Sequence, residues 1–230
     1  PATTLTILLG AGEDSLTIGP FDPDFNAAIT YEGGGGFDTL TGADETNTWN
    51  ITGKNTGTLN SQIAFSGIEN LTGGSGQDDF IFAEGADVDG IIDGGSGGFD
   101  TADYSGASSD ITVDLSRYLD NIDAVKGGTG SDTLIALPDF TTWNITNMGG
   151  GKVVVRNDER TLIADVSFTG FENLKGLVGD DTFLFASGMG VAGTIDGGGG
   201  TNTLDYSAYT AANQITVNLG TGGATGVSSV

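Results

Sequence analysis

The chain has 230 residues, of which 31 are acidic and 7 are basic, and its net charge is −24. This charge disfavours nucleic acid and anionic membrane surfaces as partners, because both are themselves negatively charged. The chain has no cysteine and no histidine, which excludes disulfides, thiolate metal sites and the commonest general base. Because it lacks both a long apolar run and a basic, apolar leader, we expect no membrane span and no signal peptide.

The apolar stretches are short and rich in β-branched and aromatic residues, which is typical of strands. In chain order, the predicted strands lie within residues 4–9, 38–42, 48–52, 78–83, 111–115, 152–157 and 165–174. The 41 glycines interrupt every stretch long enough to form an amphipathic helix, so they are interpreted as turns. The sequence therefore predicts an all-β fold with little helix.

Two internal repeats organise the chain. The phrase TWNIT begins at Thr48 and again at Thr142, and GIENL at Gly67 matches GFENL at Gly170. The two shifts are 94 and 103, so the second repeat carries nine extra residues, which we place around 149–160. We expect one continuous domain over 1–230, with a partial unit at 1–32 followed by repeats at 33–126 and 127–230.

A nine-residue pattern, Gly-Gly-x-Gly-x-Asp-x-apolar-x, recurs seven times. Complete matches begin at Gly33, Gly73 and Gly127, and partial matches begin at Leu9, Gly94, Gly176 and Gly197. Glycines that alternate between right- and left-handed backbone turn their carbonyls inward around a cation, and the aspartate completes the ring of oxygens. The alternative is a tight corner without metal, in which the aspartate side chain satisfies backbone amides.

The pattern predicts calcium ligands at the glycines and at the acidic position of each turn. They are Gly10, Gly12, Asp14, Gly34, Gly36, Asp38, Gly74, Gly76, Asp78, Gly98, Asp100, Gly128, Gly130, Asp132, Gly179, Asp181 and Asn202. The adjacent acidic pairs at 78–79 and 180–181 also suggest carboxylate catalysis, but strand alternation turns one member of each pair away.

These turns resemble the RTX, or haemolysin-type, calcium-binding repeats of secreted bacterial proteins. The resemblance implies calcium-dependent folding, an extracellular or cell-surface location and export by type I secretion. The chain departs from that family because its turns are not consecutive. RTX repeats follow one another every nine residues, whereas the acidic positions here are separated by 24, 40, 22, 32, 49 and 21 residues.

The separations of 21 to 24 residues match one coil of a β-helix, so we expect a right-handed parallel β-solenoid with coils of about 20–24 residues. The separations of 40 and 49 are interpreted as two coils each. One coil apart, turns would stack at about 4.8 Å. This predicts three stacked pairs, Asp14 with Asp38, Asp78 with Asp100 and Asp181 with Asn202, and leaves Asp132 without a neighbour.

Several other residues have alternative interpretations. Trp49 and Trp143 are predicted to lie in the core, or else to form a platform for sugar rings. Asn70 and Asn173 are predicted either to stack as an asparagine ladder or to form plain polar corners. Three basic residues at 152–160 indicate a solvated hairpin, or a contact with an acidic neighbouring subunit.

We therefore expect a non-enzymatic structural module of a secreted bacterial surface protein, such as an adhesin stalk, a spacer or a matrix element. One alternative is a protomer that associates end to end into a filament or surface layer. Another is a β-helix enzyme acting on polysaccharides, which the absence of histidine and the scarcity of basic residues disfavour. The expected partners are calcium, further copies of the chain and an extracellular polysaccharide or cell-surface ligand.

Overall fold

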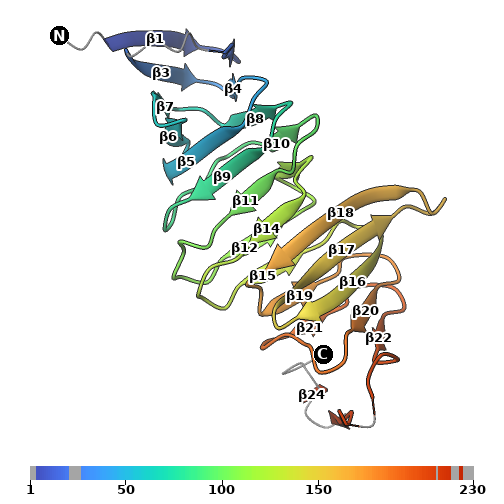
Figure 1. Ribbon diagram of the computed structural model, residues 1–230. Helices are drawn as coiled ribbons and strands as arrows, with labels where there is room; N and C mark the ends of the chain where they lie inside the picture. The colour runs from blue at the N-terminus through green and yellow to red at the C-terminus, as the bar shows by residue number, and fades with distance from the viewer. Residues whose placement is uncertain (1–3, 21–26, 211, 219–222, 225–230) are drawn as a thin grey trace. The chain divides into compact units, whose positions relative to one another are not determined.

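The computed structural model describes residues 4–20, 27–210, 212–218 and 223–224 (Figure 1). The described residues form an all-β structure without any helix, as the sequence predicted, and accordingly no helix that could cross a membrane. The chain divides into two compact units. Unit 1 comprises 1–107 and 117–124, and unit 2 comprises 108–116 and 125–230.

Unit 1 contains a long sheet in the order β1-β3-β7-β6-β5-β9-β11 and a short sheet in the order β13-β10-β8-β4-β2. Its strands are β1 (Thr4–Ala11), β2 (Ser15–Thr17), β3 (Ala28–Gly35), β4 (Thr39–Thr41), β5 (Asn47–Gly53), β6 (Thr56–Leu59), β7 (Ile63–Ser66), β8 (Asn70–Gly74), β9 (Asp78–Phe82), β10 (Ile92–Gly95), β11 (Thr101–Asp103) and β13 (Leu119–Asp120).

Unit 2 likewise contains a longer sheet, β18-β17-β16-β20-β22, and a shorter one, β12-β15-β19-β21. Its strands are β12 (Thr112–Asp114), β15 (Thr133–Ile135), β16 (Phe140–Asn147), β17 (Gly150–Arg156), β18 (Leu162–Thr169), β19 (Asn173–Lys175), β20 (Thr182–Phe185), β21 (Ile195–Asp196), β22 (Thr203–Asp205), β23 (Val217–Asn218) and β24 (Gly223–Ala224). Strand β14 (Ala124–Lys126) lies where the chain passes from unit 1 to unit 2.

Within each unit the chain alternates between the two sheets, and each return adds a parallel strand beside an earlier one. In unit 1, β1 pairs with β3 in the long sheet and β2 pairs with β4 in the short sheet, both in parallel. We name one such passage through both sheets a circuit. The first corner of a circuit leads from the long sheet to the short sheet, and the second corner leads back.

Each unit also contains one antiparallel excursion. In unit 1, β6 lies between β5 and β7 and is antiparallel to both. In unit 2, β17 lies between β16 and β18 in the same way. The predicted hairpin around 149–160 is therefore confirmed, although one face of it is buried through Val153 and Val155.

Apolar side chains from both sheets fill the space between them, because alternate residues of each strand face inward. Trp49 stacks on Phe80 of the adjacent parallel strand in unit 1, at 5.6 Å between ring centroids. Trp143 stacks on Phe183 in unit 2, at 5.7 Å. Both tryptophans are fully buried, which confirms their core role and excludes the sugar platform.

The excursions correct the interpretation of the longer separations. A hydrogen bond links Asp38 to Glu69, 31 residues later, and another links Asp132 to Glu172, 40 residues later. Each of these spans is one circuit enlarged by an antiparallel excursion, because both partners occupy first corners. The separations of 40 and 49 therefore contain one circuit plus half of the next, and the interpretation of two coils was wrong.

Candidate cation-binding corners

The acidic turns lie at the corners, where their side chains point along the stack of circuits. Asp14 and Asp38 occupy first corners in unit 1, and Asp132 occupies one in unit 2. The second corners hold Asp78 and Asp100 in unit 1 and Asp181 and Asn202 in unit 2. The turns thus belong to two corner positions, whereas the sequence pattern alone did not separate them.

At the first corners, each acidic side chain accepts a hydrogen bond from the backbone of the preceding circuit. The Asp14 N–H donates to Asp38 Oδ1 at 2.8 Å, and the Asp38 N–H donates to Glu69 Oε2 at 2.9 Å. In unit 2, the Ile111 N–H donates to Asp132 Oδ1 at 3.0 Å, and the Asp132 N–H donates to Glu172 Oε2 at 2.9 Å. Asp132 therefore has neighbours on both sides, which corrects the expectation that it has none.

The second corners repeat the arrangement. In unit 1, the N–H groups of Asn47, Asp78 and Asp100 donate in turn to Asp78 Oδ1, Asp100 Oδ1 and Asp123 Oδ2. In unit 2, the Thr141 N–H donates to Asp181 Oδ1 and the Asp181 N–H donates to Asn202 Oδ1, both at 3.0 Å. The three predicted pairs are therefore stacked as expected, and each is joined by a backbone-to-carboxylate or backbone-to-amide hydrogen bond.

The predicted glycines also stack on one another from circuit to circuit. A Cβ at Gly34, Gly36, Gly98 or Gly200 would overlap the carbonyl oxygen of Gly10, Gly12, Gly76 or Gly179, respectively. Gly10, Gly12, Gly34 and Gly36 also have positive φ, the backbone region that favours glycine. The remaining predicted glycines adjoin the same corners: Gly74 lies beside Gly95, Gly128 donates to Asp132 Oδ2, and Gly130 lies beside Ser109.

The first glycine of the pattern makes room for the carboxylate. A Cβ at Gly73 would overlap both Asp78 Oδ2 and the Gly94 carbonyl oxygen, and one at Gly176 would overlap Asp181 Oδ2. The carboxylate oxygen and a carbonyl oxygen of the next circuit thus converge on the same small volume. Only glycine permits this approach, which explains why the pattern begins with it.

In four of the corner carboxylates the Oδ2 atom, named here the outer oxygen, has no hydrogen-bond partner among the described residues. This holds for Oδ2 of Asp38, Asp78 and Asp181, whose side chains are at most 1 % exposed, and also for Asp14 Oδ2. Burial raises the pKa of Asp78 and that of Asp181 to about 6, and it also raises the pKa of Asp100. A buried carboxylate oxygen without a donor is costly, so each of these atoms favours a proton or a cation.

The corners offer oxygen atoms only, which suits a hard cation such as calcium. Calcium takes about six to eight oxygen ligands, so an ion here would need backbone carbonyls and water in addition to one carboxylate. Among the described residues, no three acidic side chains gather closely enough to hold an ion by carboxylates alone. The inner oxygen of each carboxylate is already used by a backbone N–H, as the metal-free alternative expects.

Sequence reasoning missed several corner residues that lack the glycine pattern. Glu69 and Glu172 close first corners, whereas Asn47, Asp123 and Thr141 lie at second corners. The repeated ENL phrase was the available signal for the two glutamates, because it places an acidic side chain directly before a short-sheet strand. Asn47 compensates for the missing pattern by donating its side-chain amide to three carbonyls and to Asp78 Oδ1.

Asn70 and Asn173 bridge circuits through backbone groups. Asn70 accepts from the Ile91 N–H and donates to the Asp38 carbonyl, and Asn173 accepts from the Thr194 N–H and donates to the Asp132 carbonyl. Their amides therefore do not form the side-chain ladder that was one of the two interpretations, and the polar-corner interpretation is confirmed.

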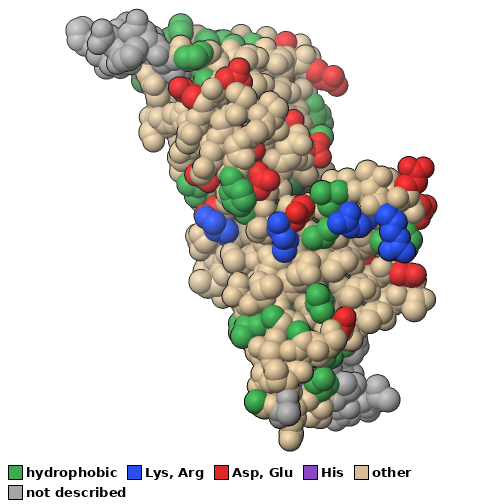
Figure 2. Space-filling model, turned by 45° about the vertical axis from the view of Figure 1, so that its right-hand side comes forward, with side chains coloured by type: hydrophobic (Ala, Val, Ile, Leu, Met, Phe, Trp, Pro, Cys, Tyr) green, Lys and Arg blue, Asp and Glu red, His purple; other side chains and the backbone are tan. Residues whose placement is uncertain are grey.

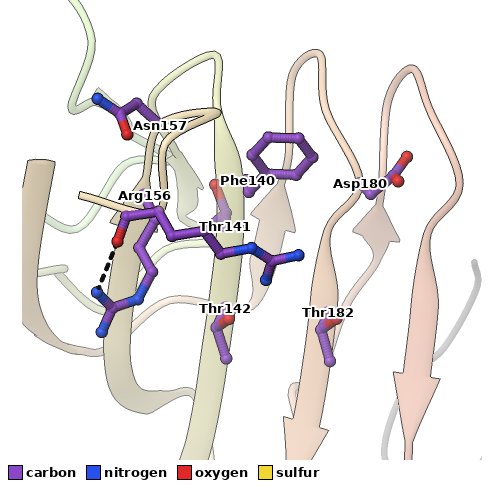
Figure 3. A pocket seen from close by; sticks show the side chains of 8 residues that line it. Phe140, Thr141, Thr142, Arg156, Asn157, Asp180 and Thr182 are labelled. Carbon is purple, nitrogen blue, oxygen red and sulfur yellow. Dashed lines mark hydrogen bonds between the residues drawn. The ribbon is translucent and has the colours of Figure 1, made fainter. Parts of the chain in front are cut away.

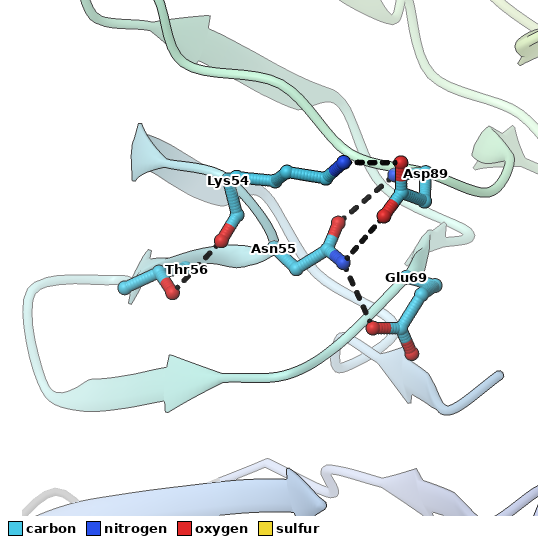
Figure 4. Close-up of polar contacts among 5 residues, drawn as sticks. All are labelled: Lys54, Asn55, Thr56, Glu69 and Asp89. Carbon is cyan, nitrogen blue, oxygen red and sulfur yellow. Dashed lines mark hydrogen bonds and ion pairs between the residues drawn. The ribbon is translucent and has the colours of Figure 1, made fainter. Parts of the chain in front are cut away.

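A polar cluster surrounds Glu69, at the third of the first corners in unit 1 (Figure 4). Asn55, which has a positive φ of 53°, donates to Glu69 Oε1 and to Asp89 Oδ2 and accepts from the Asp89 N–H. Lys54 Nζ pairs with Asp89 Oδ1 at 2.9 Å. Glu69 therefore receives a hydrogen bond at each carboxylate oxygen, unlike Asp38 and Asp78.

Comparisons with protein-family models, with curated proteins and with solved structures find no match.

Proposed function

We propose that this chain is a non-enzymatic, calcium-stabilised structural module of a secreted bacterial surface protein. In this proposal the circuits are the coils of a parallel β-solenoid, which is right-handed by the usual rule for parallel crossovers. The parallel register of both sheets and the repeated 21- to 24-residue links between corners support it. The module would serve as an adhesin stalk, spacer or matrix element.

The observation that carries the proposal is the buried, unpartnered outer oxygen at Asp38, Asp78 and Asp181. Without a cation these carboxylates raise the free energy of the folded state, because burial opposes their charge. With millimolar calcium outside the cell, weak sites with dissociation constants of about 10⁻⁴ to 10⁻³ M would fill. Calcium binding would then stabilise the folded state outside the cell, whereas inside the cell the folded state would be less stable.

A calcium titration in chelator-treated buffer, followed by circular dichroism and thermal unfolding, tests this proposal. We expect calcium to raise the unfolding temperature. The same concentration of magnesium should raise it less, because magnesium requires a stricter octahedral site. In the Asp78→Asn variant the calcium effect should shrink. The matched variant Asp79→Asn removes the same charge from the next residue of β9, which is not fully buried, and should keep the effect. Calcium-independent stability, or equal loss in both variants, would contradict the proposal.

A second candidate function is end-to-end assembly into a filament. Strand β1 pairs with β3 alone among the described strands, and it exposes Leu5 by 50 % and Leu8 by 67 %. An exposed apolar edge strand is a template for pairing with another chain. Sedimentation velocity tests this: concentration-dependent association that Leu8→Lys abolishes would support assembly, and a monomer at every concentration would exclude it.

A further inference from the structure

A cavity of about 250 Å³ lies in unit 2, at the open end of the β16–β17 hairpin, where β16 begins and β17 ends. Its lining comes from β16, β17, the turn that follows β17, the second corner before β20 and the first residue of β20 (Figure 3). The lining residues are Phe140, Thr141, Thr142, Arg156, Asn157, Arg160, Asp180 and Thr182. This cavity is smaller than the roughly 300 Å³ at which drug-sized sites begin, so it suits a single sugar-sized ring.

Strand register places the polar groups of this cavity. Thr142 and Thr182 are partners on the parallel strands β16 and β20, so their side chains stand next to each other (Figure 3). Phe140 is the antiparallel partner of Arg156, so an aromatic ring and a guanidinium lie at the same end of the hairpin. These positions depend on regular strands rather than on a loop.

The turn after β17 is held by its own hydrogen bonds. The Thr161 N–H donates to Asn157 Oδ1 at 2.9 Å, and the Arg160 N–H donates to the Asn157 carbonyl at 2.8 Å. These bonds hold Arg160 at a positive φ of 63°, which a residue with a side chain rarely adopts. The Arg160 carbonyl accepts a hydrogen bond from the Arg156 guanidinium at 3.4 Å.

Both guanidiniums lack a carboxylate partner. Within the described part of the chain, neither Arg156 nor Arg160 forms an ion pair, whereas Lys54, Lys152 and Lys175 each pair with an aspartate. Asp180 is the one acidic residue in the lining, and its Oδ1 already accepts the Thr201 N–H at 2.7 Å. The lining thus carries two positive charges and one negative charge, in a chain whose net charge is −24.

Figure 2 shows several basic side chains on one face, with acidic side chains beside some of them. Five of the seven basic residues belong to unit 2, namely Lys126, Lys152, Arg156, Arg160 and Lys175. Lys152 and Lys175 are neutralised by aspartates, so Arg156 and Arg160 are the groups that would attract an anion locally against the repulsion of the whole chain, most strongly at low ionic strength.

We propose that this cavity binds a carboxylated sugar unit of an acidic polysaccharide. Arg160 would bind the sugar carboxylate in the planar, two-bond geometry by which guanidinium groups recognise carboxylates. Arg156, whose guanidinium donates to the Arg160 carbonyl, would add a second positive charge and hold the turn that carries Arg160. The Phe140 ring, 39 % exposed, would pack against the apolar face of the sugar. Thr142, Thr182 and the free oxygen of Asp180 would hydrogen-bond the sugar hydroxyls.

A sugar explains the lining better than an acidic peptide does. A peptide carboxylate needs only the two arginines, whereas the cavity adds an exposed ring and two hydroxyls at its wall. This inference does not depend on calcium at the corners, because none of its binding groups is a proposed calcium ligand. It gives the module a ligand as well as a structural role.

Isothermal titration calorimetry of the full chain with oligogalacturonate tests the proposal, with a neutral glucose oligomer and polyglutamate as comparison probes. The titration is repeated with calcium and with chelator, because calcium could itself bridge the uronate to acidic side chains. We expect oligogalacturonate to bind in both buffers, and the neutral oligomer and polyglutamate to bind at least tenfold more weakly. Equal binding of polyglutamate would overturn the proposal in favour of an acidic peptide or subunit.

Two variants locate the binding. Arg156→Gln should weaken oligogalacturonate binding by about tenfold or more, because it removes a charged hydrogen-bond donor. Lys152→Gln removes the same charge from the same strand, but Lys152 pairs with Asp165 and does not line the cavity, so affinity should be unchanged. Unfolding temperatures of both variants verify that they fold. Absence of binding to the original chain, or equal affinity of the two variants, would overturn the proposal.

Discussion

The two antiparallel excursions, β5–β6–β7 in unit 1 and β16–β17–β18 in unit 2, have the same topology but differ in the length of their middle strand. Both return the chain beside a buried tryptophan, which opposes Leu59 in unit 1 and Val153 in unit 2. Strand β6 ends at Leu59, whereas β17 continues past Val153 to Arg156. The additional length and the turn that follows it provide Arg156, Asn157 and Arg160 to the lining of the cavity.

In unit 1 the shorter strand is closed by Asn60. Its Oδ1 accepts the Thr48 N–H at 2.8 Å, and its side-chain amide donates to Asn47 Oδ1 at 3.0 Å. Asn60 and Ser61 both have positive φ, so the chain turns back directly. The Asn60 side chain thereby provides hydrogen-bond partners for the first two residues of β5, at the position where unit 2 extends its hairpin.

The stacked circuits and the excursions are two separable parts of each unit. The stacked circuits provide the core and the acidic corners of both units, because corner bonds and aromatic stacks recur at equivalent positions. The excursions vary independently, because they add strands at a hairpin without changing the parallel register around it.

Replacing the buried tryptophans should have the largest effect. We expect Trp49→Ala and Trp143→Ala each to lower the free energy of unfolding by about 3–5 kcal/mol, since each leaves a large cavity beside stacked rings. Urea unfolding monitored by circular dichroism measures the loss. Unequal losses would show that the two aromatic stacks do not carry equivalent shares of the core, contrary to the comparison.

The first glycines of the corner pattern come next. Gly73→Ala and Gly176→Ala would each place a methyl group against a buried carboxylate, and we expect a loss of about 1–3 kcal/mol. Gly53→Ala is the control, because a Cβ there meets nothing within 4 Å. Thermal unfolding compares the three variants. If the control loses as much stability as the corner variants, crowding at the carboxylate is not the cause.

The buried corner carboxylates predict an unusual pH dependence in chelator-treated buffer. The pKa of Asp78 and that of Asp181 rise from 3.8 to about 6 on folding, so the folded state binds more protons between these values. Stability should therefore fall as the pH increases from about 4 to about 6 and level off above that range. Thermal unfolding across this range measures it. The Asp78→Asn/Asp181→Asn double variant should lose most of the slope, and an unchanged slope would assign it to other groups.

The smallest effect is expected at the closing asparagine of unit 1. Asn60→Ala should cost about 1 kcal/mol, because it leaves the Thr48 N–H without its acceptor and places alanine at a positive φ. Asn157→Ala in unit 2 should cost a similar amount but should also weaken oligogalacturonate binding, because Asn157 orders the turn that carries Arg160. Chemical denaturation and calorimetry measure the two effects, and full retention of sugar binding would show that the turn is not needed for it.

The all-β class, the repeats, the buried tryptophans and the stacked acidic pairs could be predicted from the amino-acid sequence alone. Each of these follows from a local period: alternation along a strand, a glycine pattern that only a turn accommodates, and a 21- to 24-residue spacing between turns. Such periods are visible in the letters because every copy meets the same constraint.

The pairing of the corners and the cavity beside the excursion of unit 2 could be found only in the folded chain. No local pattern indicates that Asp132 lies between Ile111 and Glu172, because an inserted antiparallel strand lengthens the circuit without changing its geometry. The cavity likewise joins residues from β16, β17, the corner before β20 and β20 itself, and Phe140 and Thr182 in its lining are 42 residues apart. Strand pairing over such distances depends on the free energy of the whole packed sheet, which no local pattern contains.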